Sequence, residues 1–130
     1  MKQTLIILLC ALFLPVLATA QRVYDDRGRF LGRVHENRFY DYRGSLIGTL
    51  EDDRLYDSAG RYLGEIEDDY IYDATGLRLG RVNGSMLYDR TGSMIGRIEG
   101  DMIYDRSGRH MGRAPGMRQK DIVLFFFFFM

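Results

Sequence analysis

The chain repeats a unit of 16 residues six times in succession, without insertion or deletion. Each copy starts its motif with Tyr-Asp, continues with two variable residues and a Gly, and places a second Gly four residues further on. A fixed period of this kind is typical of repeat architectures, in which each unit buries its apolar face against its neighbours. The repeated tyrosines and first glycines are Tyr24, Tyr40, Tyr56, Tyr72, Tyr88 and Tyr104, and Gly28, Gly44, Gly60, Gly76, Gly92 and Gly108.

The apolar residues of each unit lie in short runs that are separated by Gly, Asp and Asn. If unit position 1 is the residue before the Tyr, positions 1, 9 and 12 are apolar, as in Leu87, Ile95 and Ile98. Such a pattern is typical of short strands joined by tight turns. No window has the spacing that an amphipathic helix requires. We therefore expect an all-β fold.

Two kinds of turn alternate along the chain. The segment Asp89-Arg90-Thr91-Gly92 predicts a three-residue hairpin loop that ends in a left-handed Gly and is capped by the Asp. The second connection, for example Glu51-Asp52-Asp53, is also predicted to have three residues. A two-residue connection would turn every side chain of the next unit to the opposite face, because side chains alternate along a strand.

These turns predict how the faces of the sheet are used. Positions 1 and 9 should point inward, whereas the Tyr and position 12 should form an outer layer. The Gly at position 10 should lie opposite the next Tyr, whose ring would cover it. Strands of unequal length add a stagger at each repeat, so the two ends of the sheet can meet. The expected fold is an antiparallel five-fold flower or barrel of 16-residue β-hairpin repeats, with six-fold closure and an open coil as alternatives.

The N-terminus has the pattern of a secretory signal peptide. Lys2 precedes the apolar run Leu5–Leu17, and Ala18-Thr19-Ala20 is a typical cleavage site. We expect a signal peptide over 1–20, a repeat domain over 21–114, and a linker with an apolar tail over 115–130. The expected location is secreted or periplasmic, with outer-membrane association as an alternative. Cys10 is the only cysteine and would leave with the signal peptide.

A signal peptide followed by tandem units of Tyr-Asp-x-x-Gly-x-x-x-Gly-x-apolar resembles the small bacterial beta-flower proteins, especially their five-fold form. The resemblance covers about Val23 to Gly112. It implies short hairpins that radiate about a pseudo-rotation axis. It implies no activity, because the family is functionally uncharacterised. Six motif starts but only five complete Gly-to-Tyr connections fit either five petals with joined ends or a six-fold ring.

Composition and motifs argue against several functions. Basic and acidic residues balance at 18 each, whereas a nucleic-acid binder would have a basic excess. The two histidines, His35 and His110, occupy different places in different units, and no nucleophile elbow, phosphate loop or zinc-binding motif occurs. We therefore expect no enzyme, no catalytic residue, no cofactor and no metal site.

The charged turns have both an ordinary and a functional interpretation. The six aspartates that follow the tyrosines could gather around a hard cation, but turn capping is the preferred interpretation. One end of the molecule should be mixed to basic and the other acidic, as in Glu67, Asp68 and Asp69. Solvated loops are preferred over docking on a charged partner. The capping aspartates are Asp25, Asp41, Asp57, Asp73, Asp89 and Asp105.

The tail is the least ordinary part of the sequence. Arg118 and Lys120 precede nine apolar residues, Ile122–Met130, which include five consecutive phenylalanines. The run is too short to span a bilayer as a helix, and its composition favours a strand. It could fill the flower's own axis, add a strand to a partner's sheet, or insert shallowly into a membrane interface. The candidate interaction residues are Phe125, Phe126, Phe127, Phe128 and Phe129.

Two functional hypotheses follow. The first is a non-enzymatic interaction or structural module of the cell envelope, which docks on a protein or outer-membrane partner through its aromatic tail. The second is a carbohydrate- or wall-binding module, in which the repeated tyrosines stack against sugar rings. The absence of Trp weakens the second hypothesis, because aromatic sugar-binding arrays depend heavily on that residue.

Overall fold

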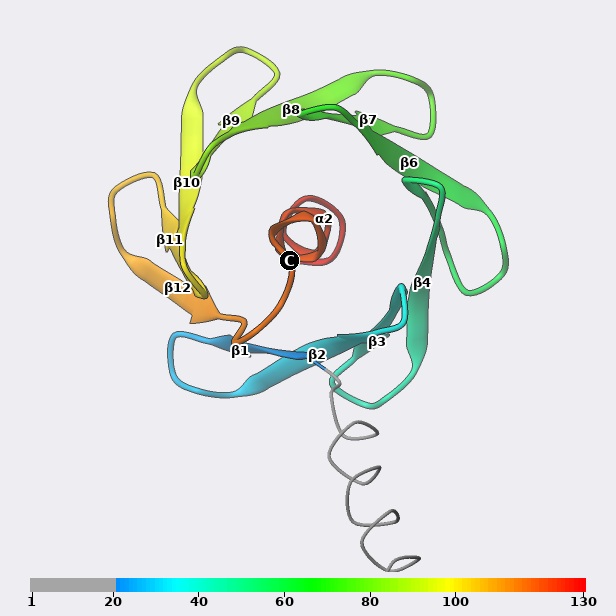
Figure 1. Ribbon diagram of the computed structural model, residues 1–130, viewed down its shortest axis with the longest axis horizontal. Coiled ribbons are helices and arrows are strands. Elements are labelled where there is room, and N and C mark those ends of the chain that lie inside the picture. Colours follow the sequence, from blue (N-terminus) through cyan, green and yellow to red (C-terminus); the bar gives the residue numbers. More distant parts are fainter. Residues whose placement is uncertain (1–20) are drawn as a thin grey trace, which may run out of the picture.

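The computed structural model describes residues 21–130, which form a closed ring of twelve antiparallel strands around one C-terminal helix (Figure 1). Consecutive strands pair with each other, and the first strand also pairs with the last. The expected signal peptide and Cys10 lie outside the described residues. The strands are β1 (Gln21–Asp25), β2 (Phe30–His35), β3 (Arg38–Asp41), β4 (Leu46–Glu51), β5 (Arg54–Tyr56), β6 (Tyr62–Glu67), β7 (Tyr70–Asp73), β8 (Arg78–Asn83), β9 (Met86–Asp89), β10 (Met94–Glu99), β11 (Met102–Asp105) and β12 (His110–Arg113).

The expected fold class is confirmed, since the repeats form a closed antiparallel flower of β-hairpins. The ring contains six hairpins, which is the six-fold closure that the sequence left as the alternative. The ends are joined by pairing of Tyr24 with Arg113 and of Asp25 with Gly112. Closure leaves no free strand edge, so the ladder offers no site for edge-to-edge aggregation.

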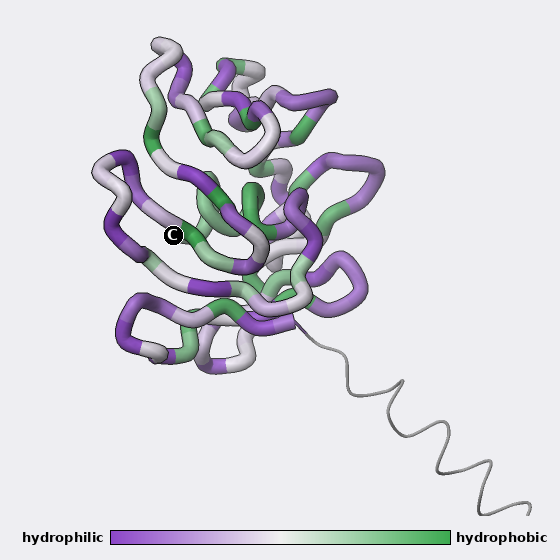
Figure 2. The backbone as a smooth tube through the Cα atoms, turned by 60° about the vertical axis from the view of Figure 1, so that its left-hand side comes forward, coloured by the Kyte–Doolittle hydropathy of each residue, from purple (hydrophilic) through white to green (hydrophobic). Residues whose placement is uncertain are grey.

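The loop after each Tyr-Asp has the predicted geometry. In the fifth hairpin the Gly92 amide donates to the Asp89 carbonyl at 3.1 Å, and the Asp89 amide donates to the Ser93 carbonyl at 2.9 Å. Gly92 has a φ of 87°, in the left-handed region that favours Gly. The corresponding glycines of the other five loops have φ between 80° and 86°. These loops form the tips of the petals, where Figure 2 shows mostly hydrophilic residues.

The prediction for the second connection was wrong. Glu51 pairs with Arg54, so only Asp52 and Asp53 form the turn. Their φ values of 50° and 66° are those of a type I′ turn, which favours Asx residues. The three later two-residue turns have a positive φ at the first central residue only, as in type II′ turns. Those first residues are Asp68, Gly84 and Gly100.

A β-bulge in every hairpin restores the face that the two-residue turn reverses. Tyr88 pairs with Met94 but Leu87 pairs with Gly96, so Ile95 at position 9 is left without a partner strand residue. The same register shift occurs between positions 1 and 2 in all six hairpins. The two-residue turn and the bulge each move the following side chains to the opposite face of the sheet. Their effects cancel within one unit, so the next unit presents the same face.

The bulge changes which positions face inward. Opposed residues of antiparallel strands share a face, and position 1 is paired with position 10 of its own hairpin and with position 12 of the preceding unit. Position 12 is therefore inside rather than outside, and Val34 is 2% exposed. Position 9 is only half-buried. Position 11, which is charged in most units, points outward. The six fully buried position 1 residues are Val23, Phe39, Leu55, Ile71, Leu87 and Ile103.

The tail forms a helix, α2 (Gln119–Phe129), on the axis of the ring (Figure 1). The predicted preference for a strand was wrong because a closed ladder has no free edge with which a strand could pair. In an apolar interior every backbone amide and carbonyl must find a partner, and only a helix satisfies these groups within its own segment. A helix that is apolar on all sides is stable when it is buried on all sides.

Glycines of the sheet make room for the phenylalanines of α2. The Gly at position 10 points inward, so the predicted cover by a Tyr ring was wrong. In four hairpins a methyl group at this Gly would lie only 2.7–2.9 Å from a phenylalanine ring, and in a fifth 3.6 Å. Residues on a helix advance by about 100° each, so five successive rings point around the whole circle. The facing pairs are Gly32 with Phe125, Gly48 with Phe129, Gly64 with Phe128, Gly80 with Phe127, and Gly96 with Phe126.

We predict that Gly80→Ala destabilises the protein more than Gly96→Ala does. The added methyl at Gly80 would lie 2.8 Å from the Phe127 ring and closer still to the Tyr88 carbonyl oxygen. At Gly96 it would lie 2.8 Å from the Tyr104 carbonyl oxygen but 3.6 Å from the nearest Phe126 carbon. We expect a loss of about 2–3 kcal/mol for Gly80→Ala and about 1 kcal/mol for Gly96→Ala. Urea unfolding measures both, and equal losses would contradict the packing of α2 against the glycines.

Candidate functional site

The five candidate phenylalanines lie inside the protein's own ring rather than in an extended tail. Phe125 is 3% exposed, and Phe126–Phe129 are half-buried against the core. The ring of Phe39 on β3 lies 5.6 Å from Phe129, centroid to centroid. Of the three predicted placements, the structure therefore has the one in the flower's axis. Within residues 21–130 no helix is long and apolar enough to cross a membrane.

Polar contacts anchor the start of α2 to the rim formed by the two-residue turns. Arg118 Nε lies 2.9 Å from the Asp121 carboxylate, and an Nη of Arg118 donates to Asn37 Oδ1 at 2.8 Å. Lys120 Nζ lies 2.6 Å from Asp53 Oδ1, and the Gln119 side chain donates to the Gly84 carbonyl. The two-residue turns of this rim therefore hold the polar start of the tail.

Asp121 is the only buried charged side chain among the described residues, at 3% exposure. It lies in the first turn of α2, where the helix dipole favours a negative charge. The hydrogen bond that Arg118 donates to it raises the pKa of the Arg118 guanidinium. Burial of this carboxylate is tolerated because its charge is paired and hydrogen-bonded.

The other end of α2 opens into an apolar hollow of about 470 Å³. Met130 and Tyr42 at this hollow are 45% and 59% exposed, so the surface is only partly covered. Three of the six half-buried residues at position 9 line it, namely Leu31, Ile47 and Met111. We call this surface the apolar end face, and it comprises Leu31, Tyr42, Ile47, Met111, Phe129 and Met130.

The repeated tyrosines point outward from the ring, and arginines cover four of them. In each case the Arg at position 11 lies over the Tyr of the next unit, its cross-strand neighbour, with 4.3–4.9 Å between the guanidinium carbon and the ring centre. The four pairs are Arg33 with Tyr40, Arg81 with Tyr88, Arg97 with Tyr104, and Arg113 with Tyr24. The tyrosines therefore do not form a continuous stacking surface.

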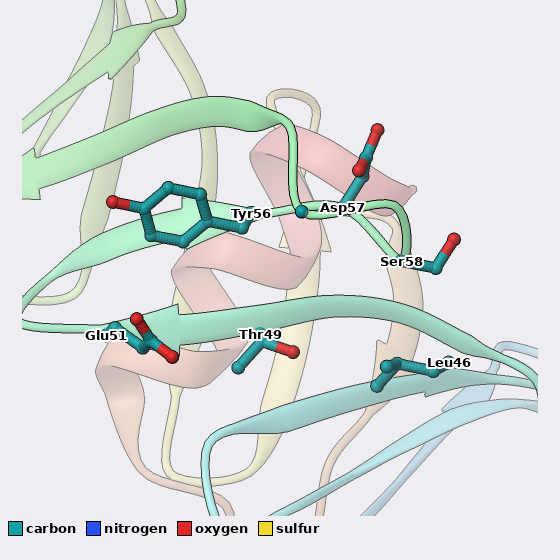
Figure 3. A pocket seen from close by; sticks show the side chains of 7 residues that line it. Leu46, Thr49, Glu51, Tyr56, Asp57 and Ser58 are labelled. Atoms are coloured by element: carbon teal, nitrogen blue, oxygen red, sulfur yellow. The ribbon is translucent and has the colours of Figure 1, made fainter.

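Tyr56 and Tyr72 are not covered by an arginine at position 11, because their cross-strand neighbours at that position are Thr49 and Glu65. At Tyr56 the difference leaves a groove of about 450 Å³ between β4 and β5. Figure 3 shows Thr49 and Glu51 on one strand and Tyr56 on the next, with Asp57 and Ser58 at the petal loop. This groove was not predicted from the sequence, although Thr49 stands at a repeat position where four of the other units have Arg.

The opposite side of Tyr56 is occupied by a second tyrosine. The Tyr62 ring lies 5.8 Å from the Tyr56 ring, and its hydroxyl donates to Glu65 Oε1 at 2.8 Å. Desolvation and the bond to Glu65 raise the pKa of Tyr62 to about 12. This hydroxyl therefore stays protonated at neutral pH and holds the carboxylate of Glu65 in place.

The six repeated aspartates cap the petal loops, as the preferred interpretation predicted. In every unit Oδ1 accepts hydrogen bonds from the backbone amides two and four residues further on, at 2.8–3.0 Å. In some units a hydroxyl adds a third bond, such as that of Thr91 to Asp89 at 2.6 Å. No cluster of three metal-binding side chains occurs within 21–130.

The twelve-stranded ring and its axial helix define the protein as a closed β-hairpin repeat. A family model described as a 5-fold beta-flower protein matches residues 20–130, and the chain belongs to that family. The match includes the tail, and the structure likewise places α2 within the ring of repeats. In this member the ring has six hairpins. The chain matches no curated protein and no solved structure.

We predict that Thr91→Val raises the pKa of Asp89. The Thr91 hydroxyl bond is the largest cause that lowers this pKa, ahead of the bonds from the Ser93 and Thr91 amides. A carboxyl whose pKa is lowered on folding contributes stability above its unfolded pKa of about 4, and this stability is lost as the pH falls through the folded pKa. Thr91→Val should therefore also weaken the acid dependence of the unfolding free energy.

Carbon-detected NMR titration of the Asp89 carboxyl measures this change, with Thr75→Val in a different petal as the matched control. The control should leave the Asp89 titration unchanged. An unchanged Asp89 midpoint in Thr91→Val would refute the assignment of the shift to that hydroxyl.

Proposed function

We propose that the protein is a non-enzymatic interaction or structural module of the cell envelope, and that it docks on a protein partner through its apolar end face. The observation that carries the proposal is the partly exposed apolar hollow in which Phe129 and Met130 meet the bulge residues. Exposed apolar surface of this kind is a common mark of interaction sites. This modifies the initial hypothesis, because the docking surface is the end of a packed helix rather than a free tail.

A secreted or periplasmic location is part of the proposal. It is supported by the signal-peptide pattern of residues 1–20 and by the absence of cysteine from 21–130. Contact with the outer membrane remains an alternative to a protein partner. The basic residues Arg118 and Lys120 do not support such contact at the apolar end face, because they pair with Asn37 and Asp53 at the opposite rim.

The absence of enzymatic activity is also proposed. Catalytic sites generally combine a pocket with convergent titratable groups. The hollow at the apolar end face has one carboxylate, Asp41, and its Oδ1 is engaged by the amides of Arg43 and Ser45. The two histidines lie apart, in β2 and β12, and His110 packs edge-on against Tyr104.

Carbohydrate binding is a second candidate, supported by the open groove at Tyr56. A sugar ring could stack on this tyrosine while Glu51 and Thr49 accept hydrogen bonds from its hydroxyls. Four of the other five repeated tyrosines are not available for stacking without displacement of the arginines that cover them. The hypothesis is therefore confined to one or two units rather than to the whole repeat.

We predict that Met130→Glu reduces retention of the protein in the envelope fraction, whereas Met102→Glu does not. Both methionines are exposed, at 45% and 37%, but Met102 belongs to β11 and not to the apolar end face. A charge at Met130 would have to be desolvated on docking, and we expect a loss of binding of at least about ten-fold. The measurement is fractionation of cells that express the full chain.

Point variants are preferable to deletion of the tail, because removal of 122–130 would empty the core of the ring. Urea midpoints of both variants should match that of the parent, which separates docking from folding. Equal retention of the two variants would contradict docking through the apolar end face.

A further inference from the structure

The outer face of the ring contains a repeated socket for a guanidinium group. Its most complete example lies between β10 and β11, where the Arg97 guanidinium carbon is 4.6 Å from the centre of the Tyr104 ring. Arg97 Nε also lies 3.2 Å from Glu99 Oε1, two residues along the same strand. The ring face and the carboxylate together hold the cation, one by a cation–π contact and the other by an ion pair without a hydrogen bond from Nε.

The groove between β4 and β5 has the same socket without its arginine. Thr49 pairs with Tyr56 in the register in which Arg97 pairs with Tyr104. Glu51 occupies the unit position of Glu99, two residues after Thr49. The threonine side chain is too short to cover the ring, and a groove of about 450 Å³ takes the place of the guanidinium.

We propose that the β4–β5 groove binds a guanidinium group, of the kind that an arginine side chain carries. The incoming group would stack on Tyr56 and pair with Glu51, as Arg97 does with Tyr104 and Glu99 within the protein. The four internal arginines show that this outer face accommodates a guanidinium at 4.3–4.9 Å from a tyrosine ring. A planar, weakly hydrated cation suits such a site better than an ammonium does.

The charges around the groove favour a cation at Glu51 rather than at Asp57. Asp57 is already paired with Arg61, whose Nε lies 2.9 Å from its Oδ2. Glu51 is exposed, and the structure shows no ion pair for it within residues 21–130. Arg54 lies directly across from Glu51 in the ladder, but it lines the neighbouring hollow with Tyr62 and Glu65, on the other side of Tyr56.

The surface at Tyr72 is not an equivalent site. Glu65 takes the place of the arginine there and is held by the hydrogen bond from Tyr62. Tyr72 also pairs with Arg78, which stacks on the adjacent Tyr70 at 5.0 Å. The vacant socket is therefore confined to one of the six repeat units, and one guanidinium is expected per chain.

The proposal is tested by NMR titration of the protein with N-acetyl-L-arginine methylamide. The lysine analogue at equal ionic strength is the control for screening. We expect saturable shifts at Tyr56, Thr49 and Glu51, with a dissociation constant on the order of 10 mM, because both contacts are solvent-exposed. The lysine analogue should shift these resonances much less. A peptide Ala-Ala-Arg-Ala-Ala forms a second arm, and tighter binding of the peptide would assign the source as a polypeptide.

Two variants test the site by filling the groove at Tyr56 and by opening an equivalent one at Tyr104. Thr49→Arg should fill the groove from within and abolish the shifts at Tyr56. Arg97→Thr should open a second socket at Tyr104 and raise the stoichiometry from one to two. Glu51→Gln should weaken binding by about three-fold. Urea midpoints of the variants confirm that each is folded.

The proposal is overturned if the arginine amide produces no saturable shift at Tyr56, or if Thr49→Arg responds as the parent does. It is also overturned if a soluble chitin oligosaccharide gives saturable shifts at Tyr56 while the arginine amide gives none. That last result would instead support the carbohydrate-binding candidate.

Discussion

The contact between phenylalanine rings and bare glycine backbone holds this structure together. A closed ring of short hairpins leaves a lumen that must be filled, because unfilled volume in a core forfeits dispersion contacts. The segment that fills it cannot pair with the walls, since the ladder has no free edge, and so it forms a helix. Five successive rings fan out from this helix, and the glycines at position 10 give them room. Ring closure, helix and glycine spacing therefore depend on one another.

The sequence predicts the outer framework of the fold better than its interior. Gly92 and Asp89 specify a local turn, so the petal loops and the hairpins follow from residue type and period, whereas the closed ring of six hairpins was predicted only as an alternative to five. The bulge at Ile95 could not be predicted from residue type. It is needed because the two-residue turn moves side chains to the opposite face, and no single residue signals this need. The helix at 119–129 was missed for a related reason. Phenylalanine favours strands where an edge is available, and only the closed ring shows that none is.

The two faces of the ring divide structural and functional roles. Positions 1, 10 and 12 face the axial helix, so their size is fixed by packing. Position 11 faces solvent, and a change there, such as Arg97 in one unit and Thr49 in another, alters the surface without disturbing the core. The C-terminal end of α2 extends from the lumen to the surface, because Phe129 packs in the lumen while Met130 is exposed. Specific sites can therefore arise in single units of a regular ring.

The most direct measurement of the central claim is an isotope-filtered NOE experiment on protein with labelled phenylalanine. The structure predicts contacts between the Phe127 ring and the α-protons of Gly80, and between the Phe128 ring and those of Gly64. These glycines lie on β8 and β6, far from the tail in sequence. Contacts of the phenylalanine rings only with one another or with solvent, and none with these glycines, would contradict a helix packed within the ring.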